Sequence, residues 1–492
     1  MGEKNTSEYR SIFKATGVFG GVQICSILFS IIKSKIVAIW LGTTGFGIIS
    51  IFNSSTSLIS SLSNLGLQSS SVRDIAAAAA SSDKEALSHK VSLTKKLAII
   101  TSVLGALITI VLSPILSNSF FKSFDYTVPF IFLSLVILFT GLSHQNNAVL
   151  QGTRSIRYLA NSTLLSSLLG LLCSIPLFFF LREKGIVFSL ILTAVFAYLC
   201  SSRFVRKLSI TVNRLSLTDT VREGWPIVKL GIFIALSNNV AYLIQFLLKA
   251  YISNKGGVGD IGLFQAGWSL NAQYVGLIFM AMSKDYYPRL CQCVGDNKAM
   301  ERKVIEQSEI GLLLLAPMIA LMISFISPVI ILLYSKEFLS ITSMTTLLLV
   351  GTIVQVASWG IGYVFLAKND GRVYFFNEVL TKLIMLPLYI LGYSLYGLEG
   401  LGYSFILNQV IYFIWVAVAA KVRYGITYSK GFFFLFFSVI IATILFVFLK
   451  NRMGIVLSVI YIIAICVISF IELDKRLQLR QLLQGFFLSL KK

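Results

Sequence analysis

The chain is dominated by apolar runs that are each long enough to cross a lipid bilayer. A helix needs about 20 such residues to cross the hydrocarbon core. With 56% hydrophobic and 13% charged residues, the 492-residue chain has too little polar surface for a soluble protein. We therefore expect an all-α polytopic membrane protein with about fourteen transmembrane helices. The predicted spans are 15–39, 46–67, 97–117, 128–150, 159–181, 186–205, 227–252, 261–283, 310–334, 343–366, 376–397, 400–420, 432–449 and 454–472.

The basic residues fall mainly on one side of these predicted helices. With the N-terminus inside, 31 of the 42 lysines and arginines lie in the N-terminal tail, the even-numbered loops and the C-terminal tail. Seven lie in the odd-numbered loops and four lie within spans. An excess of Lys and Arg in cytoplasmic loops is the usual topology signal. Both termini are thus predicted to be cytoplasmic, and the net charge of +21 indicates topology rather than nucleic-acid binding.

Residues of the first half of the chain match residues of the second half at an offset of 214 positions. The aligned pairs include Lys35 and Lys249, Gly42 and Gly256, Gly45 and Gly259, and Pro114 and Pro328. Spans one to six then match spans seven to twelve. Six spans are an even number, so the two halves have the same orientation. We expect two parallel six-helix lobes followed by a C-terminal helix pair.

These features divide the chain into five predicted parts. They are an N-lobe at 1–213, a cytoplasmic inter-lobe linker at 214–226, a C-lobe at 227–425, spans 13 and 14 at 426–472, and a cytoplasmic tail at 473–492. The linker is predicted because the stretch from Arg203 to Pro226 is polar and basic. The tail places its apolar residues on one helical face, which is typical of an amphipathic helix on the inner leaflet.

Lysines inside the spans constrain any functional interpretation, because a lysine at mid-span costs about 2.5 to 3.5 kcal/mol on insertion scales. Lys382 has a local partner in Glu378, four residues earlier on the same helix face, and this pair is a candidate for ion coupling. Lys35 and Lys249 have no acidic residue within a helical turn, and Lys33 lies close to Lys35. These lysines either snorkel to the surface or face a wet cavity that attracts an anionic substrate.

Polar residues in several spans favour the cavity interpretation. Span two carries serines and asparagines along its length, and span four ends in the run HQNN at 144–147. Such groups are poorly tolerated against hydrocarbon, so they should face the protein interior. Close packing through small residues explains the serines nearly as well, but it explains the amides less well. The predicted substrate-binding residues are Lys33, Lys35, Lys249, Asn53, Asn238, Asn239, Gln245, Asn271 and Gln273.

The loops carry no sequence signature of catalysis. The longest, at 68–96 and 284–309, are short, helix-prone and of mixed charge, without a phosphate loop or paired acids. A lone C-x-C at Cys291 and Cys293, in a chain with two histidines, does not complete a zinc site. We therefore expect transport without a cofactor or a metal, rather than an enzyme.

Two segments resemble a known family. The K-x-x-A-x-x-L-G-T-T-G-F-G-I motif at Lys35–Ile48 and the FLAKNDGRVYFFNE segment at Phe365–Glu378 are similar to O-antigen and polysaccharide flippases of the Wzx type. These belong to the multidrug/oligosaccharidyl-lipid/polysaccharide (MOP) exporter superfamily. The resemblance implies a bacterial inner-membrane flippase that moves an undecaprenyl-pyrophosphate-linked oligosaccharide to the outer leaflet by alternating access. It also implies that Lys35 and Lys249 bind the pyrophosphate.

The resemblance further implies that the partners are the lipid-linked oligosaccharide and membrane lipids, with no nucleic acid. A polysaccharide polymerase and a chain-length regulator are candidate protein partners. The two extra C-terminal spans depart from a twelve-span pattern, and a similar pair in lipid II flippases forms a groove for the lipid tail. Two alternatives stay open. A cation-coupled drug exporter of the same superfamily would prefer acidic residues inside the spans, and a membrane-embedded polysaccharide polymerase would need larger extramembrane loops.

Overall fold

The computed structural model of the chain describes residues 21–22, 24–81, 83–211, 213 and 215–477. At 217, 230, 232–238, 274, 451–455 and 457 it describes the backbone alone. The described chain is helical and contains no strand. Seven of its helical stretches are long and apolar enough to cross a membrane by length and composition, and one of them, Ile156–Arg206, holds two successive helices. The prediction of an all-α polytopic membrane protein is confirmed.

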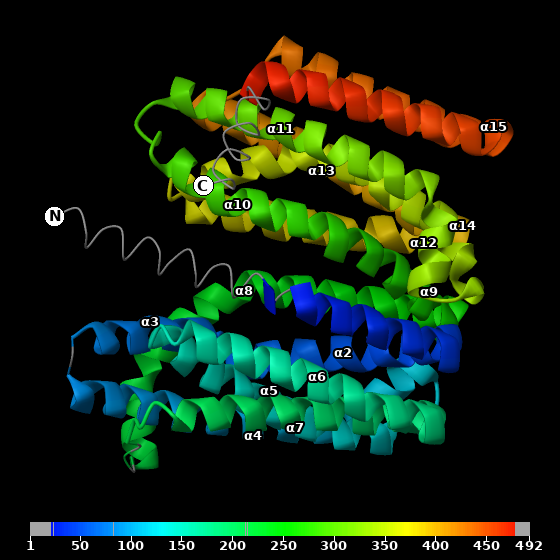
Figure 1. Cartoon of the computed structure of the whole chain (residues 1–492). Helices are drawn as coiled ribbons and strands as arrows, with labels where there is room; N and C mark the ends of the chain where they lie inside the picture. The colour runs from blue at the N-terminus through cyan, green and yellow to red at the C-terminus, as the bar shows by residue number, and fades with distance from the viewer. Residues whose placement is uncertain (1–20, 23, 82, 212, 214, 478–492) are drawn as a thin grey trace, which may run out of the picture. The chain divides into compact units, whose positions relative to one another are not determined.

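The chain divides into two compact units, each described here by itself. Unit 1 comprises residues 1–262 with 333–335, and unit 2 comprises residues 263–332 with 336–492. Unit 1 contains a helical stretch at 24–40, α2 (Gly42–Asn64), α3 (Leu67–Ala80), α4 (Lys84–Phe121), α5 (Thr127–Gly152), α6 (Ile156–Leu181), η1 (Arg182–Lys184), α7 (Gly185–Arg206), α8 (Leu217–Gly256) and the start of α9 (Val258–Ser269). Within this unit, α5 packs against α3, α4 and α7 (Figure 1).

The predicted inter-lobe linker at 214–226 is largely helical. Most of 214–226 forms the first turns of α8, which begins at Leu217 with the Ser216 hydroxyl accepting from the Asp219 amide at 3.0 Å. Apolar side chains of α3, α4 and α8 form a shared core that holds this end of α8 in unit 1. They are Leu67, Leu93, Leu97, Ala98, Ile227 and Val228. Unit 1 therefore includes all of α8, and its main segment ends at Gly262. The pairing of spans into repeated lobes stays a prediction.

The two copies of the glycine-rich motif pack on each other within unit 1. Gly42, with a φ of 62°, forms the turn before α2. A Cβ placed on Gly47 would lie 2.0 Å from the carbonyl oxygen of Val258, and one on Gly262 would lie 2.0 Å from that of Thr43. Only glycine permits such a close approach of two backbones. Gly47 and Gly262, which lie beside the repeated glycines, thus have a packing role, because they bring the first turns of α2 and α9 into backbone contact.

Unit 2 contains the rest of α9 and a series of long helices. They are η2 (Leu270–Val275), α10 (Gly276–Cys291), α11 (Asn297–Ser324), α12 (Ile326–Leu333, whose last residue belongs to unit 1), η3 (Lys336–Ile341), α13 (Thr342–Ala367), α14 (Gly371–Tyr424) and α15 (Lys430–Leu477). Gly397, with φ 58° and ψ −138°, separates α14 into two arms. Within this unit, α13 packs along α14, and α15 packs along α11 (Figure 1).

The Phe365–Glu378 segment ties together the two ends of α14. Asp370 accepts hydrogen bonds from Arg423 at 2.8 Å and from the Tyr424 hydroxyl at 2.9 Å, and its side chain caps α14 at the Val373 amide. Partial desolvation raises the pKa of Asp370. The hydrogen bonds and the Arg423 charge together lower it by a larger amount, so the pKa of Asp370 lies below its ordinary value. The segment therefore has a structural role in unit 2.

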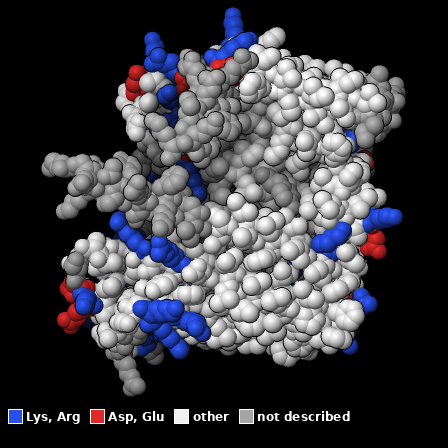
Figure 2. Space-filling view, viewed as in Figure 1, with Lys and Arg blue, Asp and Glu red and all other residues white. Residues whose placement is uncertain are grey.

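On the face seen in Figure 2, charged residues gather near the ends of the helices, and the surface between those ends is largely uncharged. In unit 1, Lys122 donates to the Asn254 carbonyl oxygen at 2.9 Å, and Arg182 donates to that of Trp40 at 3.1 Å. All four residues fall near the side predicted to be external. The multi-pass character is supported by the apolar helices, whereas the assignment of inside and outside stays a prediction.

The predicted tail at 473–492 begins as a continuation of α15. Arg476 forms ion pairs with Glu309 on α11 and, at 3.6 Å, with Glu472. The end of α15 is therefore held on unit 2 by ion pairs. The apolar face predicted between Leu479 and Leu490 lies outside the described residues.

Candidate functional site

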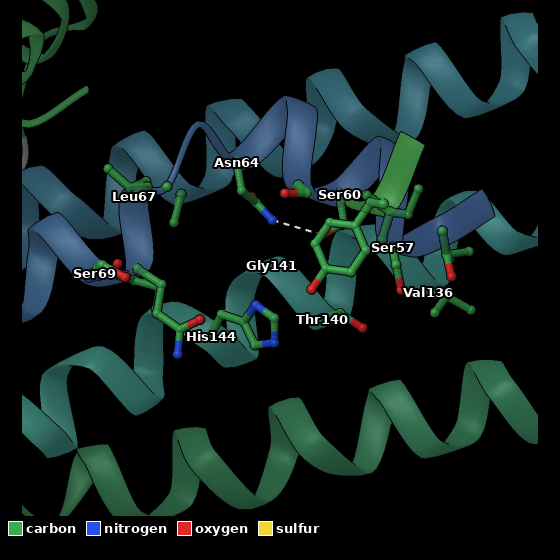
Figure 3. Close-up of a pocket in the computed structure, with 17 residues that line it drawn as sticks. Ser57, Ser60, Asn64, Leu67, Ser69, Val136, Thr140, Gly141 and His144 are labelled. Carbon is green, nitrogen blue, oxygen red and sulfur yellow. Dashed lines mark hydrogen bonds between the residues drawn. The ribbon is translucent and has the colours of Figure 1, made fainter. Parts of the chain in front are cut away.

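A polar cavity of about 380 Å³ lies within unit 1 (Figure 3). Ser57, Ser60 and Asn64 of α2 face Thr140 and His144 of α5 across it (Figure 3). The remaining walls include Thr56, Ser61, Gln68, Ser69, Val136, Gly141, Gln145 and Tyr242. None of the described lining residues is an aspartate, glutamate, lysine or arginine. The cavity therefore presents hydroxyl, amide and imidazole groups, which suit an uncharged ligand with many hydrogen-bonding groups.

The α2 wall of this polar cavity is held in place by hydrogen bonds. The Asn64 amide donates to Ser60 at 2.9 Å, and the Asn64 carbonyl oxygen accepts from Thr101 on α4 at 3.4 Å. Ser61 donates to the side-chain oxygen of Asn239 on α8. These contacts join α2 to α4 and α8, so the polar side chains are oriented by the packing of three helices.

Gln145 presents an unpaired acceptor on the α5 wall. Its amide nitrogen donates to the Thr94 hydroxyl at 2.7 Å. That hydroxyl donates to the Lys90 carbonyl oxygen at 2.9 Å, so it can only accept from Gln145. The Gln145 side chain is 3% exposed, and its Oε1 has no hydrogen-bond partner among the described residues. A buried acceptor without a partner costs about 1 to 3 kcal/mol, so a water molecule or a ligand that donates to Oε1 is stabilised there.

Gly141 sets the distance between α5 and its neighbours at the polar cavity. A Cβ on Gly141 would lie 2.1 Å from the Ser102 hydroxyl oxygen and 3.3 Å from the Asn64 side-chain oxygen. The missing side chain thus leaves room for Ser102 and Asn64 next to Gly141.

A second polar cavity of about 200 Å³ adjoins the first within unit 1. It shares Thr140 and His144 with the first cavity. Its other lining residues are Ser143, Asn147, Ser162, Thr163, Ser166 and Ala197. The buried side-chain oxygen of Asn147 has no partner among the described residues. The HQNN run therefore contributes to both cavities, because His144 lines both, Gln145 lines the first and Asn147 lines the second.

Lys33 and Asn53 line a third cavity of unit 1, which encloses about 310 Å³. The Lys33 ammonium lies 3.5 Å from the Thr193 hydroxyl and 5.9 Å from the centroid of the Phe178 ring. Lys35 is half-buried on the same helical stretch. It is not among the described residues that line these three cavities. The structure thus brings together Lys33 and Asn53, and the binding role of each stays a prediction.

Lys249 is buried on α8 with 6% of its surface exposed. Its ammonium lies 3.5 Å from the carbonyl oxygen of Ser50 on α2. This burial differs from the snorkelling alternative, in which the ammonium would reach the surface. Lys35 and Lys249 both belong to unit 1, and their placement in opposing lobes stays a prediction.

The other predicted amides are divided between the two units. In unit 1, Asn239 joins the wall of the polar cavity through Ser61, Gln245 is half-buried, and the side chain of Asn238 lies outside the part that the structure describes. In unit 2, Asn271 is buried and Gln273 is exposed. The structure therefore does not gather these residues into one site within either unit.

In unit 2, the predicted residues Asn271, Glu378 and Lys382 form polar contacts with other side chains of the unit. The Asn271 side-chain oxygen accepts from Thr352 at 2.9 Å. The expected pairing of Glu378 with Lys382 is confirmed at 3.2 Å, and the second carboxylate oxygen of Glu378 accepts from Tyr412 at 3.1 Å. The coupling role of the pair stays a prediction.

The sequence-based list of site residues missed Ser57, Ser60 and Asn64 on α2, and also Thr140, His144, Gln145 and Tyr242. The HQNN run indicated that His144 and Gln145 face the interior. Thr140 lies four residues before His144 and so on the same helix face, which was an available signal. No sequence signal pointed to Tyr242, because one tyrosine in an apolar helix is ordinary.

Comparisons with known proteins bear on the whole chain. A family model described as polysaccharide biosynthesis protein matches residues 36–343. A search of curated proteins finds no match. Among solved structures, the lipid II flippase MurJ in an inward closed conformation is similar with a TM-score of 0.68 and 13% identity, covering 93% of this chain and 99% of that chain.

Two transporter structures are also similar to this chain over most of their length. An inward-facing multidrug resistance MATE family transporter of the MOP superfamily has a TM-score of 0.66 and 15% identity, covering 81% of this chain and 95% of that one. A MOP superfamily transporter from Pyrococcus furiosus has a TM-score of 0.57 and 15% identity, covering 83% and 96%. At these identities the likeness shows that the chain has the fold of these transporters. By its family match over residues 36–343, the chain belongs to the polysaccharide biosynthesis protein family, with the fold of the MOP exporters.

Proposed function

We propose that the protein is a flippase for an undecaprenyl-pyrophosphate-linked oligosaccharide, such as an O-antigen repeat unit. It moves this substrate from the cytoplasmic to the outer leaflet of a bacterial inner membrane by alternating access. The observation that carries the proposal is the polar cavity of unit 1, in a chain of the polysaccharide biosynthesis protein family. A glycan that leaves water needs replacement hydrogen bonds, and the cavity is lined with groups that form them.

The pyrophosphate of the substrate needs positive charge, for which Lys33, Lys35 and Lys249 of unit 1 are the proposed sources. Lysine acts on a phosphate as a compact point charge. No bond of the substrate is made or broken in this proposal. Membrane lipids, a polysaccharide polymerase and a chain-length regulator are the proposed partners before and after translocation.

The proposed function is tested with purified protein in liposomes that contain a fluorescent lipid-linked oligosaccharide. A glycosidase added outside reports which glycans reach the outer leaflet. We expect faster exposure than in protein-free liposomes. We also expect Ser57→Leu, which fills the polar cavity, to slow it, and Thr44→Leu, an exposed position on the same helix, to leave it unchanged. Exposure at the protein-free rate under imposed proton, sodium and electrical gradients would refute the proposal.

The cation-coupled drug exporter is the second candidate, and the described lining of the polar cavity argues against it. A cationic drug is attracted by carboxylates, whereas none of the described lining residues carries one. Rhodamine-type dye accumulation in the same liposomes, with no movement of the glycan, would favour the exporter. Glycan recovered at higher mass would favour a polymerase.

The proposed sidedness is tested by cysteine labelling in a background without the native cysteines. A cysteine replacing the exposed Lys122 should react with an impermeant thiol reagent added to intact cells, because the proposed topology puts it outside. A cysteine replacing the exposed Lys298 should react after the cells are opened. The reverse pattern would contradict the cytoplasmic placement of both termini.

A further inference from the structure

We propose that the polar cavity of unit 1 binds an uncharged sugar residue of the substrate, and that Gln145 recognises this residue by accepting a hydrogen bond from it. The inference rests on the proposed function. It adds which part of the substrate enters unit 1 and what charge that part carries.

The first observation is the fixed orientation of the Gln145 amide. Because the Thr94 hydroxyl donates to Lys90, the end of Gln145 that faces Thr94 is its nitrogen, and the free end is the oxygen. The side chain is 97% buried, as the complement of its 3% exposure, and it lines the cavity. A sugar hydroxyl or the N–H of an acetamido group supplies the donor that Oε1 lacks.

The second observation is the charge of the walls. His144 and Tyr242 are the titratable groups among the described lining residues, and no Asp, Glu, Lys or Arg occurs among them. They face the cavity from α5 and α8, while α2 contributes serines, a threonine and an asparagine. A buried carboxylate without a cation loses far more solvation than neutral hydrogen bonds return. A neutral hexose or acetamido sugar therefore fits the cavity, whereas a uronic acid does not.

The third observation is the arrangement of donors and acceptors on two opposite walls. Ser57 and Ser60 of α2 lie across from Thr140 and His144 of α5 (Figure 3). A sugar ring carries hydroxyls around its edge, so opposing polar walls can contact it on two sides. The volume of about 380 Å³ is at the small end of ligand cavities, which span about 300 to 1,000 Å³. The cavity thus holds a small part of a glycan rather than the whole.

The test measures binding to the full-length protein in lipid nanodiscs. Three probes are compared by thermophoresis: polyprenyl pyrophosphate without sugar, the same carrier with glucose, and the same carrier with glucuronic acid. We expect the wild type to bind the glucose probe more tightly than the bare carrier and the glucuronate probe more weakly than the glucose probe. Gln145→Leu should reduce the preference for glucose over the bare carrier about twofold to tenfold, the effect of one hydrogen bond. Affinity for the bare carrier should not change.

The matched control is Asn146→Leu. Asn146 is a buried amide on the same helix, but it donates to Ser201 at 3.1 Å and does not line the polar cavity. Its substitution should keep the sugar preference. Thr140→Val, which removes a lining hydroxyl at constant shape, gives a second measurement where Gln145→Leu fails to fold.

The outcomes separate the inference from the proposed function. An unchanged sugar preference in the folded Gln145→Leu or Thr140→Val variant would mean that water alone occupies the cavity, which overturns the inference while carrier binding persists. Equal or tighter binding of the glucuronate probe would overturn the assignment of an uncharged sugar. Failure of the wild type to bind any of the three carriers would overturn the proposed function and the inference together.

Discussion

Replacement of Lys249 by methionine tests whether a buried charge is kept for function. The Lys249 side chain is 6% exposed, and its ammonium approaches the Ser50 carbonyl oxygen at 3.5 Å. That distance exceeds the usual 2.7 to 3.2 Å of an N–H···O hydrogen bond. The described residues provide no ion-pair partner for it. The Lys249 charge has therefore lost its hydration, and few protein contacts compensate for that loss.

Two effects of opposite sign are expected from Lys249→Met. Methionine keeps the length of the side chain and removes the charge, so the free energy of unfolding should rise by about 1 to 3 kcal/mol. A charge-assisted contact with a pyrophosphate contributes about 1.5 to 3 kcal/mol, so the affinity for the carrier should fall about tenfold to a hundredfold. A more stable protein that transports less is the signature of a residue kept for function.

Unfolding in mixed micelles measures the first effect, and glycan exposure in liposomes measures the second. Lys229→Met is the matched control, because Lys229 is an exposed lysine on the same helix. It should change neither quantity by much. If Lys249→Met lowers stability and leaves transport at the wild-type rate, then the lysine is a structural partner of Ser50, and the reasoning from unpaired charge is wrong.

Three further predictions address the packing and the polar contacts. Gly47→Ala should lower the free energy of unfolding by about 1 to 3 kcal/mol, because its Cβ meets a backbone oxygen at 2.0 Å, whereas Gly276→Ala, with nothing within 4 Å, should be neutral or stabilising in thermal unfolding. Asp370 has a pKa below its ordinary value, so its stabilising contribution is complete above the unfolded-state pKa and is lost as the pH falls through the folded-state pKa. Thermal midpoints between about pH 6 and pH 3 should therefore drop less in Asp370→Asn than in the wild type, and equal drops would contradict this. Glu378→Gln removes an i,i+4 pair that contributes about 0.5 kcal/mol, so the exposure of glycan in liposomes should persist. Loss of glycan exposure at normal protein level, with altered pH dependence, would assign the coupling role to Glu378.

The sequence by itself determined the helices and the contacts that lie within one helix. Apolar runs must become helices in a bilayer, since no other single segment satisfies its own backbone hydrogen bonds. The Glu378–Lys382 pair was predictable for a similar reason, because a spacing of four residues brings side chains together on any helix. The HQNN run likewise indicated an inward-facing part of α5, although not the residues that it would meet.

The tertiary structure decided every contact between helices. Gln145 meets Thr94 across 51 positions of sequence, and Lys249 meets Ser50 across 199. Both lipid and protein interior are apolar, so the pattern of one membrane helix shows which face is polar but not which helix covers it. The packing of the start of α8 in unit 1 depends on the side chains of α3 and α4 around Ile227. Such packing is a property of several helices at once, and no single stretch of the sequence contains it.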